Sequence, residues 1–204
     1  MAPHALKRMT PEEFYRWPGE EGVRYELVDG FPLKMDSLLP KAMTGASRRH
    51  DRIVVNVLSS LHAKLRGSRC RPSTDDIAVA TMNGNIRRPD LSVDCGDMPD
   101  TAFEASEPRL VVEVLSPSTR QTDLFRKLEE YKALPSLGYI LFIEPDLPRA
   151  LLWWRAPGKV WELAQFDGLD GVIGLPTIGV DLAMAEIYED VTFPDTLAGE
   201  GGLR

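Results

Sequence analysis

Two acidic residues occupy positions where the strands of a protein interior normally carry aliphatic side chains. Asp90 follows Pro89 at the start of the segment Asp-Leu-Ser-Val-Asp, and Glu113 lies inside the run Leu-Val-Val-Glu-Val-Leu at residues 110–115. A carboxylate in such a run loses several kcal/mol of hydration unless it is protonated, paired or bound to a metal ion. We therefore interpret both as inward-facing acids with a chemical role, and Glu113 as the stronger signal.

The two acids can meet if residues 88–95 and 109–116 form neighbouring antiparallel strands. Asp90 then begins one strand and Glu113 lies near the end of the other. Two carboxylates and the backbone carbonyl of Val114, with water completing the shell, suit a hard divalent cation such as Mg²⁺ or Mn²⁺. Such an ion activates water and stabilises charge on a phosphate. The sequence therefore predicts a metal site at one end of the sheet.

Lys127 is the cation that we expect to complete this site. A helix is predicted over residues 122–134, with Leu124, Leu128 and Tyr131 on one face. Lys127 lies three residues after Leu124 and four before Tyr131, so it borders the sheet-facing side and can reach back toward the strand end. There it would stabilise the attacking hydroxide or the phosphorus.

The other elements follow from capping patterns, turns and periodicity. A short helix is expected to begin after Thr10, with Glu13 completing a capping box, and the Asp-Gly turn at residues 29–30 predicts a hairpin. The clearest helix spans residues 47–66. Further strands are expected at residues 76–81, 87–95, 109–116, 139–143, 150–154, 160–166 and 178–182. Mixed strands with two main helices predict one α/β or α+β domain over residues 10–190, with residues 1–9 and 195–204 as flexible termini.

Composition excludes several classes of protein. The chain has 204 residues, 43% hydrophobic and 27% charged, and a formal net charge of -7, which excludes collagen-like, coiled-coil and wholly disordered proteins. No apolar run approaches the roughly 20 residues that span a bilayer. The N-terminus lacks the apolar region of a secretory signal, so we expect a cytoplasmic protein without a membrane partner. With only Cys70 and Cys95, neither a disulfide framework nor a structural zinc site is expected.

Positive charge is concentrated in the middle of the chain. Residues 41–90 carry ten Lys or Arg against four Asp, a local charge of +6. Such a segment could face a polyanion such as nucleic acid, although a solvated helix face with loops explains it equally well. Backbone N–H groups in the turn after residue 115 would also favour an anion, with Ser118 as a candidate cap. The candidate phosphate contacts are Arg48, Arg49, Arg52, Arg87, Arg88 and Ser118.

Three further residues are candidate accessories to the site. Glu26 could join the metal shell or hold an arginine, unless it faces solvent from its strand. His50 begins the long helix on the same side as Val54, where a histidine at the edge of the core is the alternative to a phosphate or supporting role. Asp76 precedes a strand and could be a supporting acid, although it most simply ends a loop.

The residues also resemble a known family. Pro89-Asp90 followed by Glu113 after a hydrophobic strand resembles the PD-(D/E)xK nuclease pattern. The fuller set of strings resembles the Uma2 family, whose members are restriction-endonuclease-like, over roughly residues 10–190. These strings are RRPDLSVD (87–94), VVEVLSPSTR (111–120), FRKLEEY (125–131) and GYILFIEPD (138–146).

The resemblance implies a central mixed sheet flanked by helices, with an extra N-terminal hairpin and C-terminal strands. It implies a Mg²⁺-dependent endonuclease acting on DNA, with Asp90 and Glu113 as metal ligands and Lys127 as the catalytic cation. The pattern places a lysine two residues after the glutamate, but Leu115 stands there, so Lys127 would act from the helix instead. A homodimer is also plausible, because many nucleases of this fold pair.

Two other functions remain open at this point. A catalytically silent relative could keep the fold as a binding or assembly module without binding metal. A carboxylate-pair hydrolase such as a glycosidase could work without metal. Titration of the wild-type protein and Glu113→Gln with Mn²⁺ discriminates the first from a nuclease, and chelator-resistant turnover of a sugar would favour the second.

Overall fold

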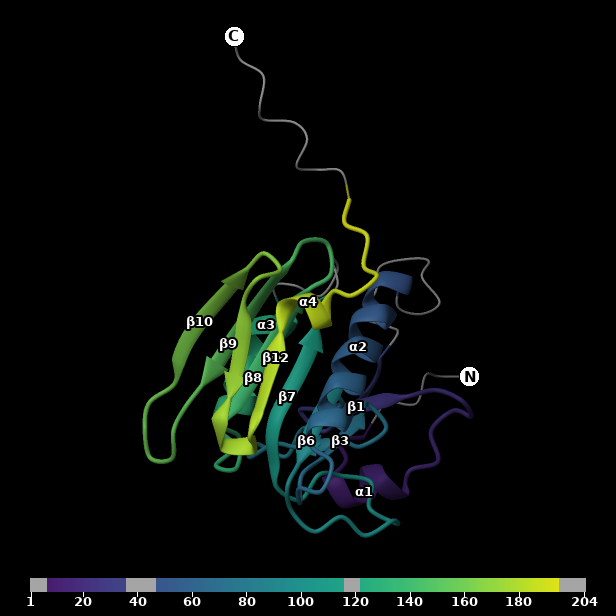
Figure 1. The fold of residues 1–204 in the computed structure, drawn as a ribbon. Coiled ribbons are helices and arrows are strands. Elements are labelled where there is room, and N and C mark those ends of the chain that lie inside the picture. Colours follow the sequence, from purple (N-terminus) through teal and green to yellow (C-terminus); the bar gives the residue numbers. More distant parts are fainter. Residues whose placement is uncertain (1–6, 36–46, 116–121, 195–204) are drawn as a thin grey trace.

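A six-stranded mixed sheet forms the centre of the computed structural model, which describes residues 7–35, 47–115 and 122–194 (Figure 1). Its strand order is β10-β9-β8-β7-β6-β3. β7 and β8 are parallel and the other neighbours are antiparallel. The bounds are β3 (Arg71–Thr74), β6 (Leu91–Asp94), β7 (Pro108–Val114), β8 (Tyr139–Glu144), β9 (Arg149–Trp154) and β10 (Glu162–Asp167).

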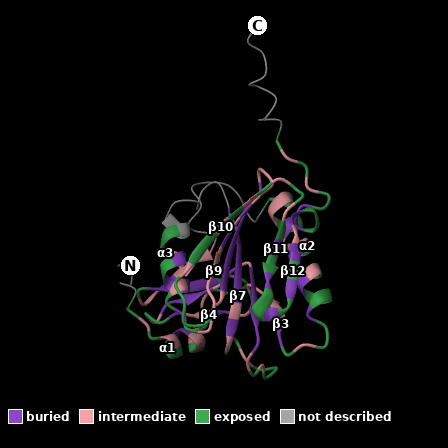
Figure 2. Ribbon diagram, turned by 60° about the vertical axis from the view of Figure 1, so that its left-hand side comes forward, coloured by how far each residue is buried: buried purple, intermediate pink, exposed green. Residues whose placement is uncertain are grey.

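Helices cover both faces of this sheet. The long helix α2 (Arg48–Lys64) begins at the N-cap Ser47 and packs Ile53, Val57 and Leu61 against one face. The helix α3 (Thr122–Lys132) connects the two parallel strands and packs on the opposite face. A strand buried on both faces reads as a continuous apolar run, which explains the sequence of β7 (Figure 2). Glu113 is the charged residue within that run and faces α3.

Two smaller sheets complete the fold. The first has the order β2-β1-β5-β4, and the second pairs β11 with β12 beside α2. The first contains the predicted hairpin, whose turn residues Asp29 and Gly30 have φ angles of 52° and 82°. The bounds are α1 (Pro11–Arg16), β1 (Tyr25–Val28), β2 (Phe31–Lys34), β4 (Val79–Ala80), β5 (Ile86–Arg87), β11 (Val172–Leu175), η2 (Pro176–Ile178), β12 (Val180–Ala183) and α4 (Met184–Ile187).

The predicted mixed α and β fold is confirmed, although β3 and β11 were not expected and the strand expected at residues 87–95 is interrupted. That segment is divided between the two larger sheets, because β5 ends at Arg87 and β6 begins at Leu91. Pro89 lies between them and has no N–H to donate to a strand ladder, so the chain leaves one sheet and enters the other there. Asp90 consequently stands just before β6 rather than inside a strand.

The expectation that the two cysteines form no disulfide is wrong. Cys70 and Cys95 form a disulfide, although they are 25 residues apart in the sequence. They flank the register pair Arg71–Asp94 of β3 and β6, so the antiparallel pairing brings them together. Residues 7–35, 47–115 and 122–194 include no helix that is both long and apolar enough to cross a membrane.

Candidate functional site

Strand pairing brings Asp90 next to Glu113. β6 and β7 are antiparallel with Leu91 opposite Val112, so the backbone of Asp90, one residue before Leu91, lies level with Glu113. The backbone N–H of Val114 donates a hydrogen bond of 2.7 Å to Asp90 Oδ2. This bond holds the aspartate carboxylate against the end of β7.

Glu113 is buried beneath α3, and its carboxylate accepts hydrogen bonds from two side chains of that helix. The Nζ of Lys127 lies 3.0 Å from Oε1 and 3.3 Å from Oε2, and the hydroxyl of Tyr131 donates to Oε1 at 2.8 Å. Lys127 and Tyr131 are four residues apart, so they share one side of α3. Burial raises the pKa of Glu113 to about 7; Lys127 opposes the rise, and the charges of Asp90 and Glu26 add to it.

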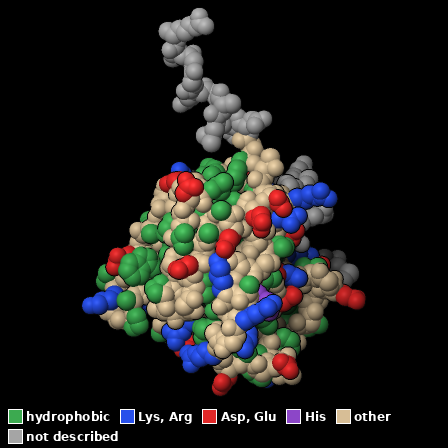
Figure 3. All heavy atoms as spheres, in the orientation of Figure 1, with side chains coloured by type: hydrophobic (Ala, Val, Ile, Leu, Met, Phe, Trp, Pro, Cys, Tyr) green, Lys and Arg blue, Asp and Glu red, His purple; other side chains and the backbone are tan. Residues whose placement is uncertain are grey.

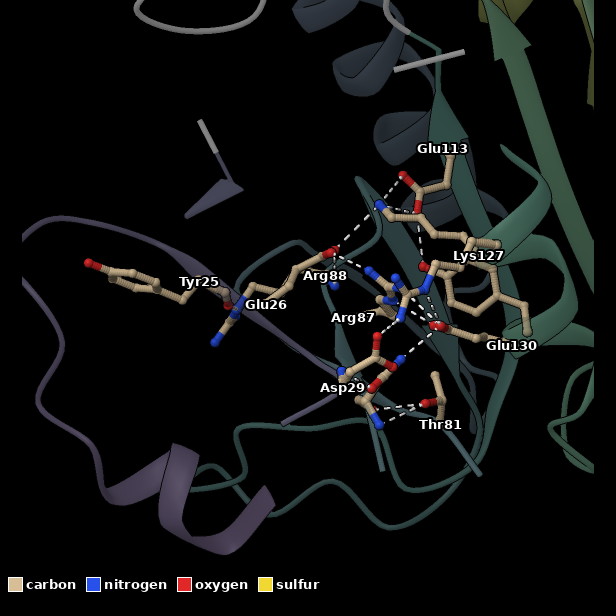
Figure 4. Close-up of polar contacts among 12 residues, drawn as sticks. Tyr25, Glu26, Asp29, Thr81, Arg87, Arg88, Glu113, Lys127 and Glu130 are labelled. Carbon is tan, nitrogen blue, oxygen red and sulfur yellow. Dashed lines mark hydrogen bonds and ion pairs between the residues drawn. The ribbon is translucent and has the colours of Figure 1, made fainter. Parts of the chain in front are cut away.

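Glu26 approaches the same lysine from the four-stranded sheet (Figure 4). Its Oε1 lies 3.4 Å from Lys127 Nζ and accepts a 3.0 Å hydrogen bond from the backbone N–H of Arg88, while its Oε2 accepts from Arg87 at 2.8 Å. Burial opposes ionisation, but the charges of Lys127 and Arg87 hold the pKa of Glu26 below its ordinary value. Of the two roles expected for Glu26, holding an arginine is what the contacts show.

Arg87 lies in the interior, so the expectation that it contacts phosphate is wrong. Its side chain is 3% exposed, and its guanidinium donates to both oxygens of Glu130, at 2.6 and 2.9 Å, and to Glu26. Asn85 also donates to Glu130 at 2.8 Å. A guanidinium enclosed by two carboxylates has no surface left for a phosphate. It joins the four-stranded sheet to α3 instead.

His50 lies at the start of α2, next to Asp90. Its Nε2 is 3.4 Å from Asp90 Oδ1, and its ring also hydrogen-bonds to the backbone of Val114. Burial lowers the pKa of His50, but the hydrogen bond to Asp90 and the charge of that aspartate outweigh it and raise the pKa. His50 therefore contacts Asp90 and Val114 from α2, whereas Lys127 contacts Glu113 from α3 on the other face of the sheet.

The side chains of Asp76, Arg88 and Arg49 have partners of their own outside the Asp90–Glu113–Lys127 cluster. The carboxylate of Asp76 is exposed and pairs with Arg24 at 3.2 Å. The guanidinium of Arg88 donates to the backbone carbonyls of Tyr25, Asp75 and Asp76. Arg49 pairs with Asp146 at 2.6 Å. Ser118 lies outside the described residues.

The basic segment does not form one surface. α2 has 17 residues and is therefore roughly 25 Å long, with Arg48 and Arg52 near its N-terminal end and Arg66 and Arg69 beyond its C-terminal end. Figure 3 shows Lys and Arg side chains interspersed with Asp and Glu on the face drawn. At the site end of α2, Arg48 and Arg52 are exposed, and they remain the candidates for phosphate contact.

Asp90 and Glu113 are the carboxylates at this site that could hold a divalent cation. In the part of the chain that the structure describes, no group of three or more His, Cys, Asp or Glu is arranged to hold a metal ion. Burial is the main cause of the raised pKa of Glu113, and the charge of Asp90 adds to it, so a divalent cation would neutralise negative charge held there. Mg²⁺ keeps several water ligands and commonly uses one or two carboxylates, so this pair fits it.

Tyr131 and Glu130 are site residues whose roles sequence analysis missed. Tyr131 appeared only as a sheet-facing residue of the predicted helix, and Glu130 gave no signal. The i,i+4 spacing of Lys127 and Tyr131 is the sequence feature that could have associated the tyrosine with the site.

Comparisons with known proteins agree on a nuclease-like family and fold. Residues 11–185 match the family described as "Uma2: Putative restriction endonuclease". An uncharacterized protein of Synechocystis is 29% identical over 189 residues, which cover 91% of this chain and 94% of that protein. The crystal structure of "a putative nuclease belonging to DUF820" from Anabaena variabilis covers 88% of this chain and 97% of that chain, with a TM-score of 0.66 and 19% identity. At that identity the structural likeness establishes the fold alone.

Proposed function

Because this chain belongs to the Uma2 family of restriction-endonuclease-like proteins, we propose that it is a metal-dependent endonuclease acting on DNA. The observation that carries the proposal is the buried Glu113 carboxylate, which stands opposite Asp90 and has the Lys127 ammonium 3.0 Å away. Two acids and a lysine at one end of a sheet are the groups that metal-assisted phosphodiester hydrolysis would need.

Asp90 and Glu113 would hold Mg²⁺ or Mn²⁺, with the Val114 carbonyl as a further ligand. When bound, such an ion would lower the pKa of its water ligand and neutralise charge on the phosphate. The protein holds the two carboxylates in advance: His50 and the Val114 N–H fix Asp90, and Tyr131 fixes Glu113. Preorganised ligands of this kind need no rearrangement at the moment of reaction.

Lys127 would stabilise the charge that develops on the phosphate oxygens. Leu115, at the position where the PD-(D/E)xK pattern has its lysine, is buried in the core between the sheet and α3 with Leu128. A lysine at residue 115 would thus be buried in an apolar layer. Placing the cation on α3 keeps that layer intact and still sets an ammonium against Glu113.

The test combines metal binding with DNA cleavage. We expect wild type to bind Mn²⁺ in calorimetry and to cut plasmid DNA with Mg²⁺ but not with a chelator. Asp90→Ala should lose cleavage while its melting temperature stays close to that of wild type, and Glu113→Gln should lose Mn²⁺ binding. Full activity in Asp90→Ala would refute the assignment. The same assays on an RNA duplex decide which nucleic acid is the substrate.

A binding or assembly module without catalysis is the second candidate, favoured by Leu115 in place of the pattern's lysine. It predicts DNA binding with unchanged affinity in the presence of a chelator and no cleavage with any divalent ion. Absence of Mn²⁺ binding in wild type would select this function over the nuclease.

A further inference from the structure

Lys127 stands between two carboxylates that come from different sheets. Glu113, on the six-stranded sheet, is 3.0 Å from the ammonium, and Glu26, on the four-stranded sheet, is 3.4 Å from it (Figure 4). The Glu26 residue is only 4% exposed, and Glu113 is 9% exposed. At such burial, water screens the attraction weakly, so both carboxylates hold the lysine strongly.

Under the proposed mechanism, Glu113 is a metal ligand and Glu26 is not. Glu113 would give its charge to a divalent cation, and the ammonium would then stand beside that cation with its first partner engaged elsewhere. Like charges in a weakly screened interior repel each other. A lysine held by Glu113 alone would therefore move away from the site when the cation binds.

Glu26 is held in place by contacts that do not involve Lys127. One oxygen, Oε2, is bound to Arg87, which is itself held by Glu130 on the other side of its guanidinium. The other oxygen, Oε1, is bound to the Arg88 backbone N–H and faces Lys127. Oε2 is thus kept for Arg87, while Oε1 serves both the Arg88 N–H and Lys127. A carboxylate oxygen has room for two partners, so the anchoring of Glu26 does not displace its contact to the lysine.

We propose that Glu26 is a positioning residue, which keeps the Lys127 ammonium at the site when a metal ion takes over Glu113. The proposal rests on the proposed nuclease function for its purpose, but the contact itself can be tested without metal or activity. It also gives the N-terminal four-stranded sheet a role, because that sheet contributes Glu26 to a site whose other acids lie at the end of the six-stranded sheet.

The first experiment measures how fast the Lys127 ammonium protons exchange with water, by ¹⁵N NMR, with the signal assigned by its loss in Lys127→Met. Glu113→Gln imitates neutralisation of Glu113 without any metal. In that variant we expect exchange within about twofold of wild type, because Glu26 still holds the lysine. In the double variant Glu113→Gln/Glu26→Gln we expect exchange about tenfold faster, because the lysine then also loses its buried ion pair with Glu26.

Glu130→Gln is the matched control, because it removes a buried carboxylate that shares Arg87 with Glu26 but lies beyond the guanidinium from Lys127 (Figure 4). In Glu113→Gln/Glu130→Gln the exchange should stay close to that of Glu113→Gln. Equal acceleration in the two double variants would overturn the proposal, since Glu26 would then act only through the stability of the fold.

The second experiment separates this role from the proposed function. Glu26→Gln should lower kcat for DNA cleavage while leaving Mn²⁺ affinity within about twofold, because neither proposed metal ligand changes. Glu162→Gln, which changes an exposed carboxylate on β10, should alter neither kcat nor Mn²⁺ affinity. An unchanged kcat in Glu26→Gln would overturn the proposal. If wild type neither binds Mn²⁺ nor cuts DNA, the nuclease function fails, and the exchange rates still decide whether Glu26 holds Lys127.

Discussion

Replacing Glu113 by Gln should make the metal-free protein more stable at pH 8 than wild type, and by much less at pH 5. The carboxylate is buried against Asp90 and Glu26, and its pKa is raised to about 7 from an ordinary value of 4.5. An acid with a raised pKa in the folded state stabilises that state when protonated. This contribution is fully present below the unfolded pKa and is lost as the pH rises through the folded pKa.

The size of the effect follows from the two pKa values. One pKa unit corresponds to about 1.4 kcal/mol, so the interval from 4.5 to about 7 corresponds to about 3 kcal/mol, most of which is lost between pH 5 and pH 8. Gln resembles the protonated acid at every pH, and its amide oxygen can still accept from Tyr131 and Lys127. The variant therefore avoids this loss, and its advantage over wild type should grow by about 2–3 kcal/mol across the interval.

Urea unfolding of both proteins with a chelator, at pH 5 and at pH 8, measures the difference directly. Glu162→Gln, an exposed carboxylate on β10, is the control and should leave the pH dependence of stability close to that of wild type. If the wild type and Glu113→Gln differ by the same free energy at both pH values, the Lys127 pair keeps Glu113 ionised throughout. The inferred repulsion from Asp90 and Glu26 would then be too weak to favour a bound cation.

Three further predictions concern the contacts around the site and the fold. Tyr131→Phe removes a hydrogen-bond donor that lowers the pKa of Glu113, so that pKa should rise. In the same unfolding series, the variant should therefore lose stability at a higher pH than wild type does. Arg48→Ala/Arg52→Ala should reduce the slope of log DNA affinity against log salt by about 2, measured by fluorescence anisotropy with Ca²⁺. Reduction of the Cys70–Cys95 disulfide, which closes a 25-residue separation, should lower the free energy of unfolding by about 3–4 kcal/mol, and Cys70→Ser/Cys95→Ser should be insensitive to reductant.

Local patterns in the sequence were sufficient for the features that depend on neighbouring residues. The capping box of Thr10 and Glu13, the Asp-Gly turn and the apolar periodicity of α2 each act within a few residues, and all three stand where they were predicted. An acid inside an aliphatic run was sufficient to single out Glu113, because burial of such a run is itself a consequence of composition.

Only the tertiary structure decided what the buried charges touch. Glu26 and Arg87 are 61 residues apart, and Arg87 and Glu130 are 43 residues apart, so no local pattern relates them. Arg87 reads as a surface cation in the sequence, yet it is enclosed because it lies on β5 of the four-stranded sheet, between Glu26 on β1 and Glu130 on α3. The same long-range pairing joins Cys70 to Cys95. Short-range periodicity determines which side of an element is buried, whereas the partner of a buried charge is determined by how separate elements pack, and that is encoded in no single segment.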